Sequence, residues 1–380
     1  MFDTIVTGLG AVGSAAAFRL ASRGNRVLGL DRFSPPHALG SSHGKSRIIR
    51  EAYFENPLYV PLVQRSYECW AEVETLSGRQ LYTRTGGLMI GPPDGAVVGG
   101  ARASALAHGL PFEELSAAEL QRRVPAFHPD AGTVAIWEPR AGILAPEAAI
   151  EVHLTLARAA GAELRFDEPM LKWSAAGDQV EVTTSRGTVR AAQLVIAAGA
   201  WARDLLSDLA LPLTVERNVV YWFDPEQPTK SFNPERFPIF IHEFAPGRAW
   251  YGFPDAGDGV KVALHHQGES THPDSLRRTV ADDEIAFVRA LLARHVPEAN
   301  GPLRETTVCM YTNTPDEHFI IDRHPAHPAI IIASPCSGHG FKFSSAVGEV
   351  IADLATGRTS RFDLRPFGLS RLRRTGVGLA

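Results

Sequence analysis

The sequence has few cysteines, and this shortage excludes two kinds of stabilised protein. Only Cys69, Cys309 and Cys336 occur among 380 residues, and no two of them form a CxxC pair. Neither a disulfide framework nor a structural zinc site is supported, and we predict no metal site. We therefore expect the chain to work in the reducing cytoplasm.

Long hydrophobic runs and blocks of like charge are also missing. No run approaches the roughly 18 apolar residues that a membrane span needs, and no basic region precedes the first apolar stretch. The 38 basic and 42 acidic residues leave a net charge of −4, so neither a nucleic-acid-binding arm nor a polybasic membrane anchor is expected. Since 44% of the residues are hydrophobic, the length indicates roughly two to three globular domain-sized units.

Lysine is scarce as well, because arginine supplies most of the positive charge. Only five of the 38 basic residues are lysines: Lys45, Lys172, Lys230, Lys261 and Lys342. A lysine in an otherwise specialised setting therefore calls for a reason.

The N-terminus carries a strand, a glycine turn, a helix and a second strand. The apolar run Phe2–Thr7 precedes a GxGxxG segment over 8–13, and an alanine-rich stretch and a second apolar run follow before Asp31. A GxGxxG segment alone is weak evidence, but this one stands in the right order with its acid about 20 residues on. The order predicts a dinucleotide site, and the alternative is a tight turn in another βαβ unit.

Each residue of this motif has a physical role in binding a dinucleotide. Gly8 allows the tight turn, Gly10 lets a pyrophosphate approach the backbone, and Gly13 lets the helix pack against the strand. The positive end of the helix attracts the phosphates, and Asp31 is expected to bind the adenosine ribose. This motif does not distinguish FAD from NAD.

Two later segments favour FAD. A buried-strand pattern over 193–198 ends at Gly199, as in flavoproteins where such a segment passes beside the cofactor. A second strand pattern, 329–333, leads to a turn with Gly338 and Gly340 before a helical stretch. The free N–H groups of this turn suit an anionic target such as the pyrimidine edge of a reduced flavin.

Because these pieces lie at the beginning, middle and end of the chain, the domain that they form is discontinuous. We predict an α/β protein in which residues 1–87, 138–213 and 315–380 form a Rossmann-type FAD-binding domain. Residues 88–137, which are rich in Pro and Ala and expected to be helical, and residues 214–314, which carry alternating strands, then form an α+β substrate domain.

A β-hairpin is predicted where the segments 251–254 and 260–265 flank an Asp- and Gly-rich turn. Strand alternation places Lys261 and His265 on the same face. Such a polar face is either exposed to solvent or forms a cavity wall that holds a cation and an imidazole near a redox cofactor.

Four other residues are candidates for the functional site, and each of them has a purely structural role as its alternative. Cys309 lies in an apolar strand, where a cysteine is more often a small core residue than a nucleophile. Lys342 lies in the first turn of a predicted helix, where its charge opposes the helix dipole unless it serves an anion. Arg47 and Arg50 are three positions apart beside apolar residues, so they either grip a carboxylate or face solvent.

Taken together, these segments resemble the family of monomeric sarcosine oxidase and N-methyltryptophan oxidase, which are flavin-dependent amine oxidases. The resemblance implies a glutathione-reductase-type FAD domain with a mixed-sheet substrate domain. It also implies that dioxygen oxidises a secondary amino acid to an aldehyde, a demethylated amino acid and hydrogen peroxide. The matching segments are collinear over nearly the whole chain: 8–13, 35–37, 44–50, 52–53, 251–254, 309–312, 318–322 and 337–343.

The resemblance assigns roles around the flavin. It implies that the FAD is covalent, through a thioether from its 8α-methyl group to Cys309, and that Lys261 activates dioxygen. Ser46 and Arg47 are expected to lie against the flavin.

The resemblance also assigns roles around the substrate. Arg50 and Lys342 are expected to bind its carboxylate, and His265, Tyr251 and Tyr311 to line the amine pocket.

The sequence departs from the family pattern at four places. Ser46 stands where threonine is usual, and the turn before Lys261 is about one residue short. Cys336 introduces a thiol just before the second glycine turn, which makes it a rival of Cys309 for the flavin. The segment 240–244 contains His and Glu where an apolar stretch is expected at the edge of the pocket.

Several functions therefore stay open from the sequence. The main alternatives are an amino-acid dehydrogenase with an acceptor other than oxygen, an oxidase of cyclic imino acids such as pipecolate or proline, and an inactive flavin-binding scaffold. The expected partners are an amino-acid substrate and dioxygen, with no nucleic acid and no membrane. We expect a monomer.

Overall fold

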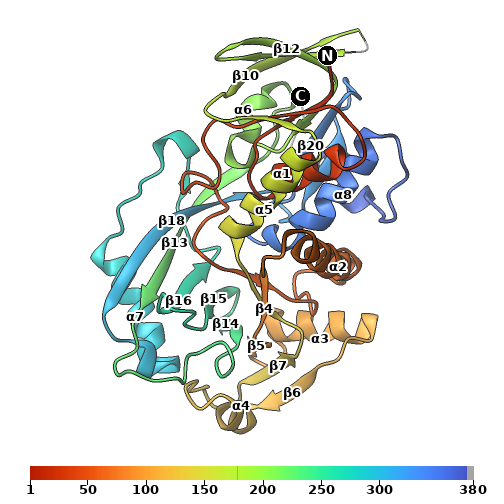
Figure 1. Ribbon diagram of the computed structural model, residues 1–380. Helices are drawn as coiled ribbons and strands as arrows, with labels where there is room; N and C mark the ends of the chain where they lie inside the picture. The colour runs from red at the N-terminus through yellow and green to blue at the C-terminus, as the bar shows by residue number, and fades with distance from the viewer. Residues whose placement is uncertain (178, 375–380) are drawn as a thin grey trace.

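The computed structural model describes residues 1–177 and 179–374 (Figure 1). Its first large sheet has eight strands in the order β10-β11-β12-β1-β2-β9, with β20 paired to β12 and β19 to β20. The five strands β9, β2, β1, β12 and β20 run parallel to one another. At the edges, β11 pairs antiparallel with β12, β10 with β11, and β19 with β20. The strands are β1 (Phe2–Thr7), β2 (Val27–Leu30), β9 (Glu163–Arg165), β10 (Met170–Ala176), β11 (Gln179–Thr184), β12 (Gly187–Ile196), β19 (Ile320–Arg323) and β20 (Ile330–Ser334).

Helices from distant parts of the chain pack beside this sheet. Helix α1 (Ala11–Ala21) contacts both α5 (Pro146–Ala159) and α8 (Ser344–Ala355), and α8 also contacts α2 (Val60–Ser77). The approach of α1 and α8 requires a glycine at Gly348, where a Cβ atom would lie 2.7 Å from the backbone of Ala15.

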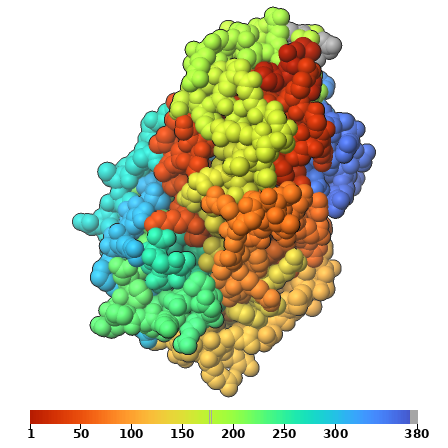
Figure 2. Space-filling view, in the orientation of Figure 1, coloured from red at the N-terminus to blue at the C-terminus, as the bar shows by residue number. Residues whose placement is uncertain are grey.

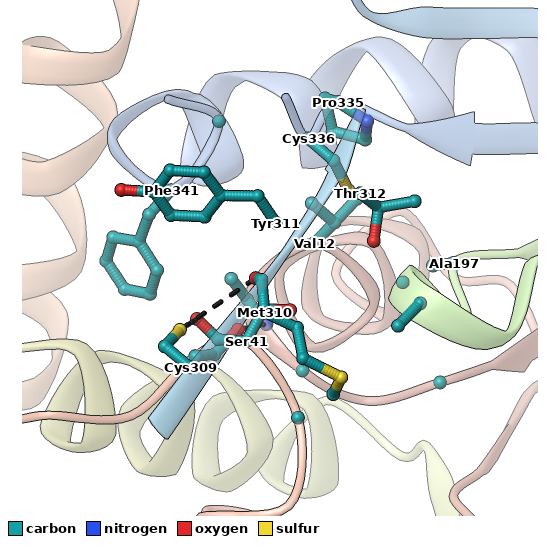
Figure 3. A pocket seen from close by; sticks show the side chains of 18 of the residues that line it. Val12, Ser41, Ala197, Cys309, Met310, Tyr311, Thr312, Pro335, Cys336 and Phe341 are labelled. Carbon is teal, nitrogen blue, oxygen red and sulfur yellow. Dashed lines mark hydrogen bonds between the residues drawn. The ribbon is translucent and has the colours of Figure 1, made fainter. Parts of the chain in front are cut away.

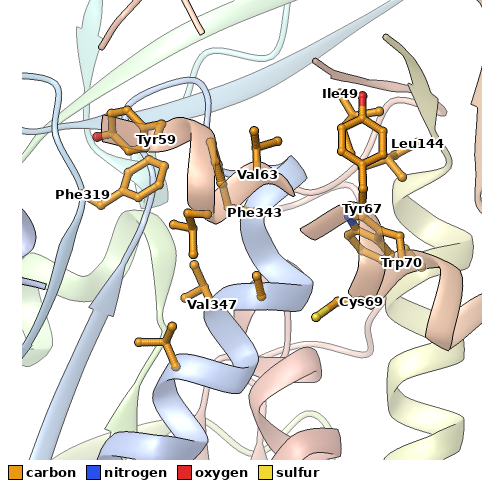
Figure 4. Packing of buried hydrophobic residues seen from close by; sticks show 14 of the residues in the cluster. Ile49, Tyr59, Val63, Tyr67, Cys69, Trp70, Leu144, Phe319, Phe343 and Val347 are labelled. Atoms are coloured by element: carbon orange, nitrogen blue, oxygen red, sulfur yellow. The ribbon is translucent and has the colours of Figure 1, made fainter. Parts of the chain in front are cut away.

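A buried aromatic cluster fills the space between α2 and α8. Figure 4 shows Tyr59 and Val63 facing Phe343 and Val347, with Phe319 alongside. This packing fixes the position of the turn that precedes α8.

The second large sheet has nine strands in the order β17-β13-β16-β15-β14-β5-β7-β6, with β18 paired to β13. Its hairpin β15–β16 is the predicted one, with Phe253 opposite Lys261. Strands β5, β6 and β7 come from a segment that the sequence indicated as helical, so that expectation was incomplete. The strands are β5 (Gly87–Gly91), β6 (Glu113–Ser116), β7 (Val134–Glu138), β13 (Thr214–Phe223), β14 (Ile239–Ala245), β15 (Arg248–Phe253), β16 (Val260–His265), β17 (Ser270–Thr271) and β18 (Leu303–Asn313).

The two faces of this sheet have different neighbours, as strand alternation requires. On β13, Tyr221 and Phe223 pack into a core that includes α7 (Asp282–His295), whereas Val220 and Trp222 pack with Ala263. Short helices α3 (Ala96–His108), α4 (Ala117–Arg123), α6 (Ala202–Leu205) and α9 (Ser370–Arg374) complete the described helices.

A third, small sheet has three strands. Strands β3 (Arg47–Ile49) and β4 (Tyr82–Arg84) pair with the two edges of β8 (Gly142–Leu144). In the space-filling view, residues from the start, middle and end of the chain share the upper half of the molecule (Figure 2). The mixed sheets and their helices confirm the α/β class. The division at the expected domain boundaries stays a prediction.

Among the described helices, none combines the length and the apolar character that crossing a membrane requires.

Candidate functional site

A cavity of about 520 Å³ is lined by residues from all three sheets and from the turns beside them. Gly13 is not at its surface, but the other sequence-predicted site residues are. These are Gly8, Gly10, Asp31, Ser46, Arg47, Arg50, Gly199, Tyr251, Lys261, His265, Cys309, Tyr311, Gly338, Gly340 and Lys342. The fold thus brings together side chains that are more than 300 positions apart.

One end of the cavity is the N-terminal glycine turn. Gly8 has a φ of +82°, and a Cβ atom on Gly13 would lie 1.7 Å from the carbonyl oxygen of Gly8, so both positions require glycine. Helix α1 starts here, and the N–H groups of its first turn have no acceptor within the helix. The carboxylate of Asp31 already accepts hydrogen bonds from the N–H groups of Leu9, at 2.6 Å, and Phe33, at 2.8 Å. These bonds hold the acid at the cavity wall.

The second glycine turn lies at the other end. Ser337 and Gly338 have φ values of +51° and +73°, and a Cβ atom on Gly340 would lie 1.6 Å from the carbonyl oxygen of Pro335. The turn leads into the short helical segment Phe341–Phe343 and then α8. Lys342 therefore lies just before α8 and, like Gly338, faces the cavity.

Lys261 is buried in the cavity wall, so the predicted alternative of a solvent-exposed face does not apply. Its Nζ atom donates to the carbonyl oxygens of Gly44 and Ser46, both at 2.8 Å, and to Oγ of Ser46 at 3.1 Å. Burial and the nearby charge of Arg47 push the pKa of Lys261 well below its usual value. The two carbonyl oxygens, with the Ser46 hydroxyl as a third contact, nevertheless favour the ammonium form, which has three N–H donors.

Both candidate thiols line the cavity (Figure 3). The sulfur of Cys309 lies 3.7 Å from Nη2 of Arg47 and 3.4 Å from the carbonyl oxygen of Ser41. The sulfur of Cys336 has a neutral neighbour instead, the hydroxyl of Ser334 at 3.6 Å. Burial raises the pKa of the Cys336 thiol.

Arg50 is fully buried and is already paired with an acid. Its Nη2 atom lies 2.7 Å from Oε1 of Glu55, and its guanidinium stacks on Tyr53 and Phe54 at 4.3 and 4.4 Å from the ring centroids. Burial opposes ionisation of Glu55, but the charge of Arg50 outweighs it and the pKa of the carboxyl falls to about 2. The Nε atom of Arg50 is buried without a hydrogen-bond partner, so one donor of this guanidinium is unsatisfied.

Lys342 shares this end of the cavity with Arg50. Its Nζ atom donates to the carbonyl oxygen of His339 at 2.8 Å and to the hydroxyl of Tyr53 at 3.4 Å. Burial and the charge of Arg50 lower the pKa of Lys342 to about 7. The paired cations therefore favour an anion between them.

The third group of side chains is aromatic. The hydroxyls of Tyr251 and Tyr311 lie 3.3 Å apart, and the His265 ring centroid lies 5.8 Å from that of Tyr311. Burial raises the pKa of Tyr311 and lowers the pKa of His265. Both tyrosines are thus neutral donors, and His265 is a neutral ring at the same wall.

Comparison with known proteins identifies the family. The sequence model of the FAD dependent oxidoreductases matches residues 3–354.

The chain belongs to the FAD dependent oxidoreductase family.

It also belongs, as the sequence motifs predicted, with monomeric sarcosine oxidase and N-methyl-L-tryptophan oxidase. Monomeric sarcosine oxidase of Streptomyces avermitilis is 49% identical, with 100% of this chain and 99% of that protein covered. The same enzyme of Bacillus sp. (strain B-0618) is 41% identical over 97% and 96% of the two chains. N-methyl-L-tryptophan oxidase of Salmonella typhimurium is 36% identical over 97% and 99%.

Solved structures have the same fold. NikD, an unusual amino acid oxidase essential for nikkomycin biosynthesis, matches with a TM-score of 0.85 and 25% identity over 97% of each chain. L-proline dehydrogenase from P. horikoshii matches with a TM-score of 0.86 and 22% identity over 98% of each chain. The latter likeness concerns the fold alone.

The cavity has the features that FAD, the cofactor of this family, needs. The turn at Gly8 and the start of α1 suit its pyrophosphate, and Asp31 lies beside this turn at the cavity wall. Because Gly8, Gly338 and Lys342 all line one cavity, an elongated ligand can span from the first glycine turn to the second.

The structure corrects one expectation about the pocket edge. Of the segment 240–244, only Ile241 lines the cavity. His242 instead accepts a hydrogen bond from Nε1 of Trp250 at 2.9 Å, and Glu243 accepts one from the N–H of Val97 at 3.1 Å. His242 therefore belongs to the opposite face of β14, whereas Glu243 is on the same face as Ile241 but binds the first turn of α3 instead of lining the cavity.

Three features of the site were not predicted from the sequence. They are the ion pair of Glu55 with Arg50, the contact of Tyr53 with Lys342, and the aromatic side chains around Lys261. Trp222 and Phe253 lie 5.4 and 4.5 Å from the lysine Nζ atom, measured to the ring centroids. An acid five positions after Arg50 was a visible signal for an ion pair. No sequence signal indicated the aromatic side chains around Lys261, because their position depends on how the strands pair.

Proposed function

We propose that this protein is an FAD-dependent oxidase of secondary amino acids, with sarcosine or another N-methyl amino acid as substrate. One observation carries the proposal: a single cavity joins the dinucleotide turn to the buried pair Arg50 and Lys342 and to the buried cation Lys261. The names of the relatives support the same reaction class. Substrate, dioxygen and water yield an aldehyde, a demethylated amino acid and hydrogen peroxide.

The substrate carboxylate binds to the two cations. Arg50 contributes the positive charge of its guanidinium at the cavity wall, and the Lys342 ammonium supplies a second charged donor. The amine then lies towards His265, Tyr251 and Tyr311, whose side chains form the facing wall of the cavity. Burial of these groups keeps water away from the reacting carbon.

Bound FAD supplies the redox chemistry by taking a hydride equivalent from the carbon beside the amine nitrogen and passing electrons to dioxygen. Lys261 contributes a fixed positive charge, which stabilises the negative charge that develops on dioxygen. Its three backbone and hydroxyl acceptors prevent the ammonium from moving away.

We further propose that the flavin is bound covalently to Cys309 rather than to Cys336. The guanidinium of Arg47 lies beside the Cys309 sulfur, whereas the Cys336 sulfur has the neutral hydroxyl of Ser334 as its neighbour, and a neighbouring cation favours the action of a cysteine as a nucleophile. With the flavin at Cys309, Arg47 and Ser46, which line the same cavity, would lie against it.

Purified protein tested with sarcosine, other N-methyl amino acids, pipecolate and proline, with hydrogen peroxide as the readout, decides the proposal. Peroxide formation from an N-methyl amino acid is the expected result. Flavin reduction without peroxide would favour a dehydrogenase, which the buried Lys261 argues against. No reaction with any secondary amino acid would refute the proposal. A single protein chain, as the names of the monomeric relatives suggest, is the expected active species.

A further inference from the structure

We propose that His266 and Glu216 form an ion pair behind the cavity wall that positions His265 and keeps its ring an acceptor for the substrate amine. This inference rests on the proposed function, because it concerns the amine side of that reaction. His266 follows His265 directly at the end of β16, and Glu216 lies on β13. Neither His266 nor Glu216 lines the cavity, so both act through His265.

The carboxylate of Glu216 is held in a fixed orientation. Its Oε2 atom lies 3.3 Å from Nδ1 of His266 and accepts a hydrogen bond from the side-chain amide of Asn313 at 2.8 Å. Its Oε1 atom accepts the N–H of Gly268 at 2.9 Å. Three donors, two from the loop after β16 and one from the end of β18, therefore fix this carboxylate, and the carboxylate in turn fixes the His266 ring.

The His266 ring is wedged between groups that face the cavity. Its centroid lies 4.2 Å from that of His265 and 5.2 Å from that of Tyr311. Its backbone has a φ of +50°, which residues other than glycine rarely adopt. A Cβ atom on Gly338 would lie 3.1 Å from its Nε2 atom, so the glycine turn leaves just enough room for the ring.

The pKa values of the two neighbouring imidazoles are shifted in opposite directions. Burial opposes a charge on His266, but the hydrogen bond to Glu216 and the negative charge of Glu317 outweigh it and raise the pKa of His266. For His265, burial and then the charge of His266 hold the pKa well below its usual value.

Other charged groups also face the two rings. Glu55 favours the charged form of both histidines, while His339 and Arg50 oppose a charge on His265. The His266 ring is in contact with that of His265, and its charge has a larger effect on His265 than those of the other groups.

A neutral His265 keeps a ring nitrogen with a free lone pair. The ring makes no hydrogen bond to any described residue and lines the cavity, so the lone pair is available to an N–H of the substrate amine. A protonated ring would lose this acceptor and repel an ammonium substrate. The pair behind it thus sets the pH below which the amine site fails.

The test compares Glu216→Gln and His266→Gln holoenzymes with the wild type. Anaerobic flavin reduction by sarcosine is measured across the acid range. In both variants we expect the pH at which the rate falls to move upward by about one unit, because a neighbouring charge shifts a pKa by roughly that much or more. The shift is expected to be larger in His266→Gln, where Glu216 stays negative. The control is Glu269→Gln, an exposed acid that pairs with Arg277, which should leave the profile unchanged.

A titration of the His265 ring by NMR in the same holoenzymes requires no turnover. A His265 pKa that rises in both variants supports the inference, and an unchanged pKa with an unchanged pH profile overturns it. If the pKa rises but the wild type oxidises no secondary amino acid, the proposed function fails while the coupling between the two histidines stands.

Discussion

The guanidinium of Arg47 lies 3.7 Å from the sulfur of Cys309, although the two residues are 262 positions apart in the chain. Strand β3 carries the arginine and strand β18 the cysteine. The contact places a cation beside a thiol inside the cavity of a flavoprotein, which is the environment in which a cysteine acts as a nucleophile.

Replacing Cys309 should release the flavin. In wild-type protein denatured with acid and passed through a size filter, flavin absorbance is expected to stay with the polypeptide. Cys309→Ala should release it and Cys336→Ala should retain it, because only Cys309 has a cationic neighbour. Retention by Cys309→Ala with release by Cys336→Ala would instead make Cys336 the attachment site. Release from all three proteins would exclude a thioether.

Replacing Lys261 should slow the reaction with oxygen and leave the reaction with substrate largely intact. A preorganised charge beside a developing anion contributes about 10²–10³-fold, so Lys261→Met is expected to reoxidise its flavin at least 100-fold more slowly. Anaerobic flavin reduction by substrate should change much less. Lys45→Met is a matched control, since Lys45 is partly exposed and pairs with Asp258 and Glu305. Equal reoxidation rates in all proteins would remove the role of Lys261.

Removing the Arg50 charge should weaken binding of the carboxylate. A hydrogen bond to a charged group contributes about 1.5–3 kcal/mol, so the KM for sarcosine is expected to rise roughly 10- to 100-fold. Because Arg50→Gln alone would leave Glu55 buried and unpaired, the variant should also carry Glu55→Gln. A secondary amine without a carboxylate serves as the control, and it should react equally with both proteins. An equal loss with this amine would show a general defect of the site.

Lys342 should make anion binding depend on pH. Its pKa in the folded protein is about 7, well below the usual 10.5, so the ammonium is lost as the pH rises through 7. A bound carboxylate favours the ammonium, and binding should therefore take up a proton and weaken above about pH 7. Titration of the flavin spectrum with acetate, which has no amine of its own, measures this affinity. Lys342→Arg should bind acetate without this pH dependence, and the same dependence in that variant would assign it to another group.

Local patterns predicted the parts of the fold that depend on neighbours in sequence. The N-terminal turn at Gly8 and the hairpin that carries Lys261 are local, and the structure contains both. Alternation along β16 also placed Lys261 and His265 on one face, because the period of a strand does not depend on the rest of the protein.

Contacts between distant segments could not be predicted in this way. The His242 side chain points away from the cavity because the other face of β14 lines it. Which face does so is decided by how β14 pairs with its neighbours β15 and β5. Likewise, Lys342 and Tyr53 are 289 positions apart in the chain. Their contact depends on how α8 packs against α2. Strands β5 and β7 were missed because they pair with each other although α3, β6 and α4 lie between them in the chain.

The central claim is that this cavity oxidises a secondary amino acid and then returns electrons to oxygen. The most direct test mixes the yellow protein with sarcosine and other N-methyl amino acids without air, records the visible flavin band, and then admits air. The account predicts that the band bleaches with a secondary amino acid and returns in air, with one hydrogen peroxide formed for each flavin reoxidised. A band that no secondary amino acid bleaches would contradict it.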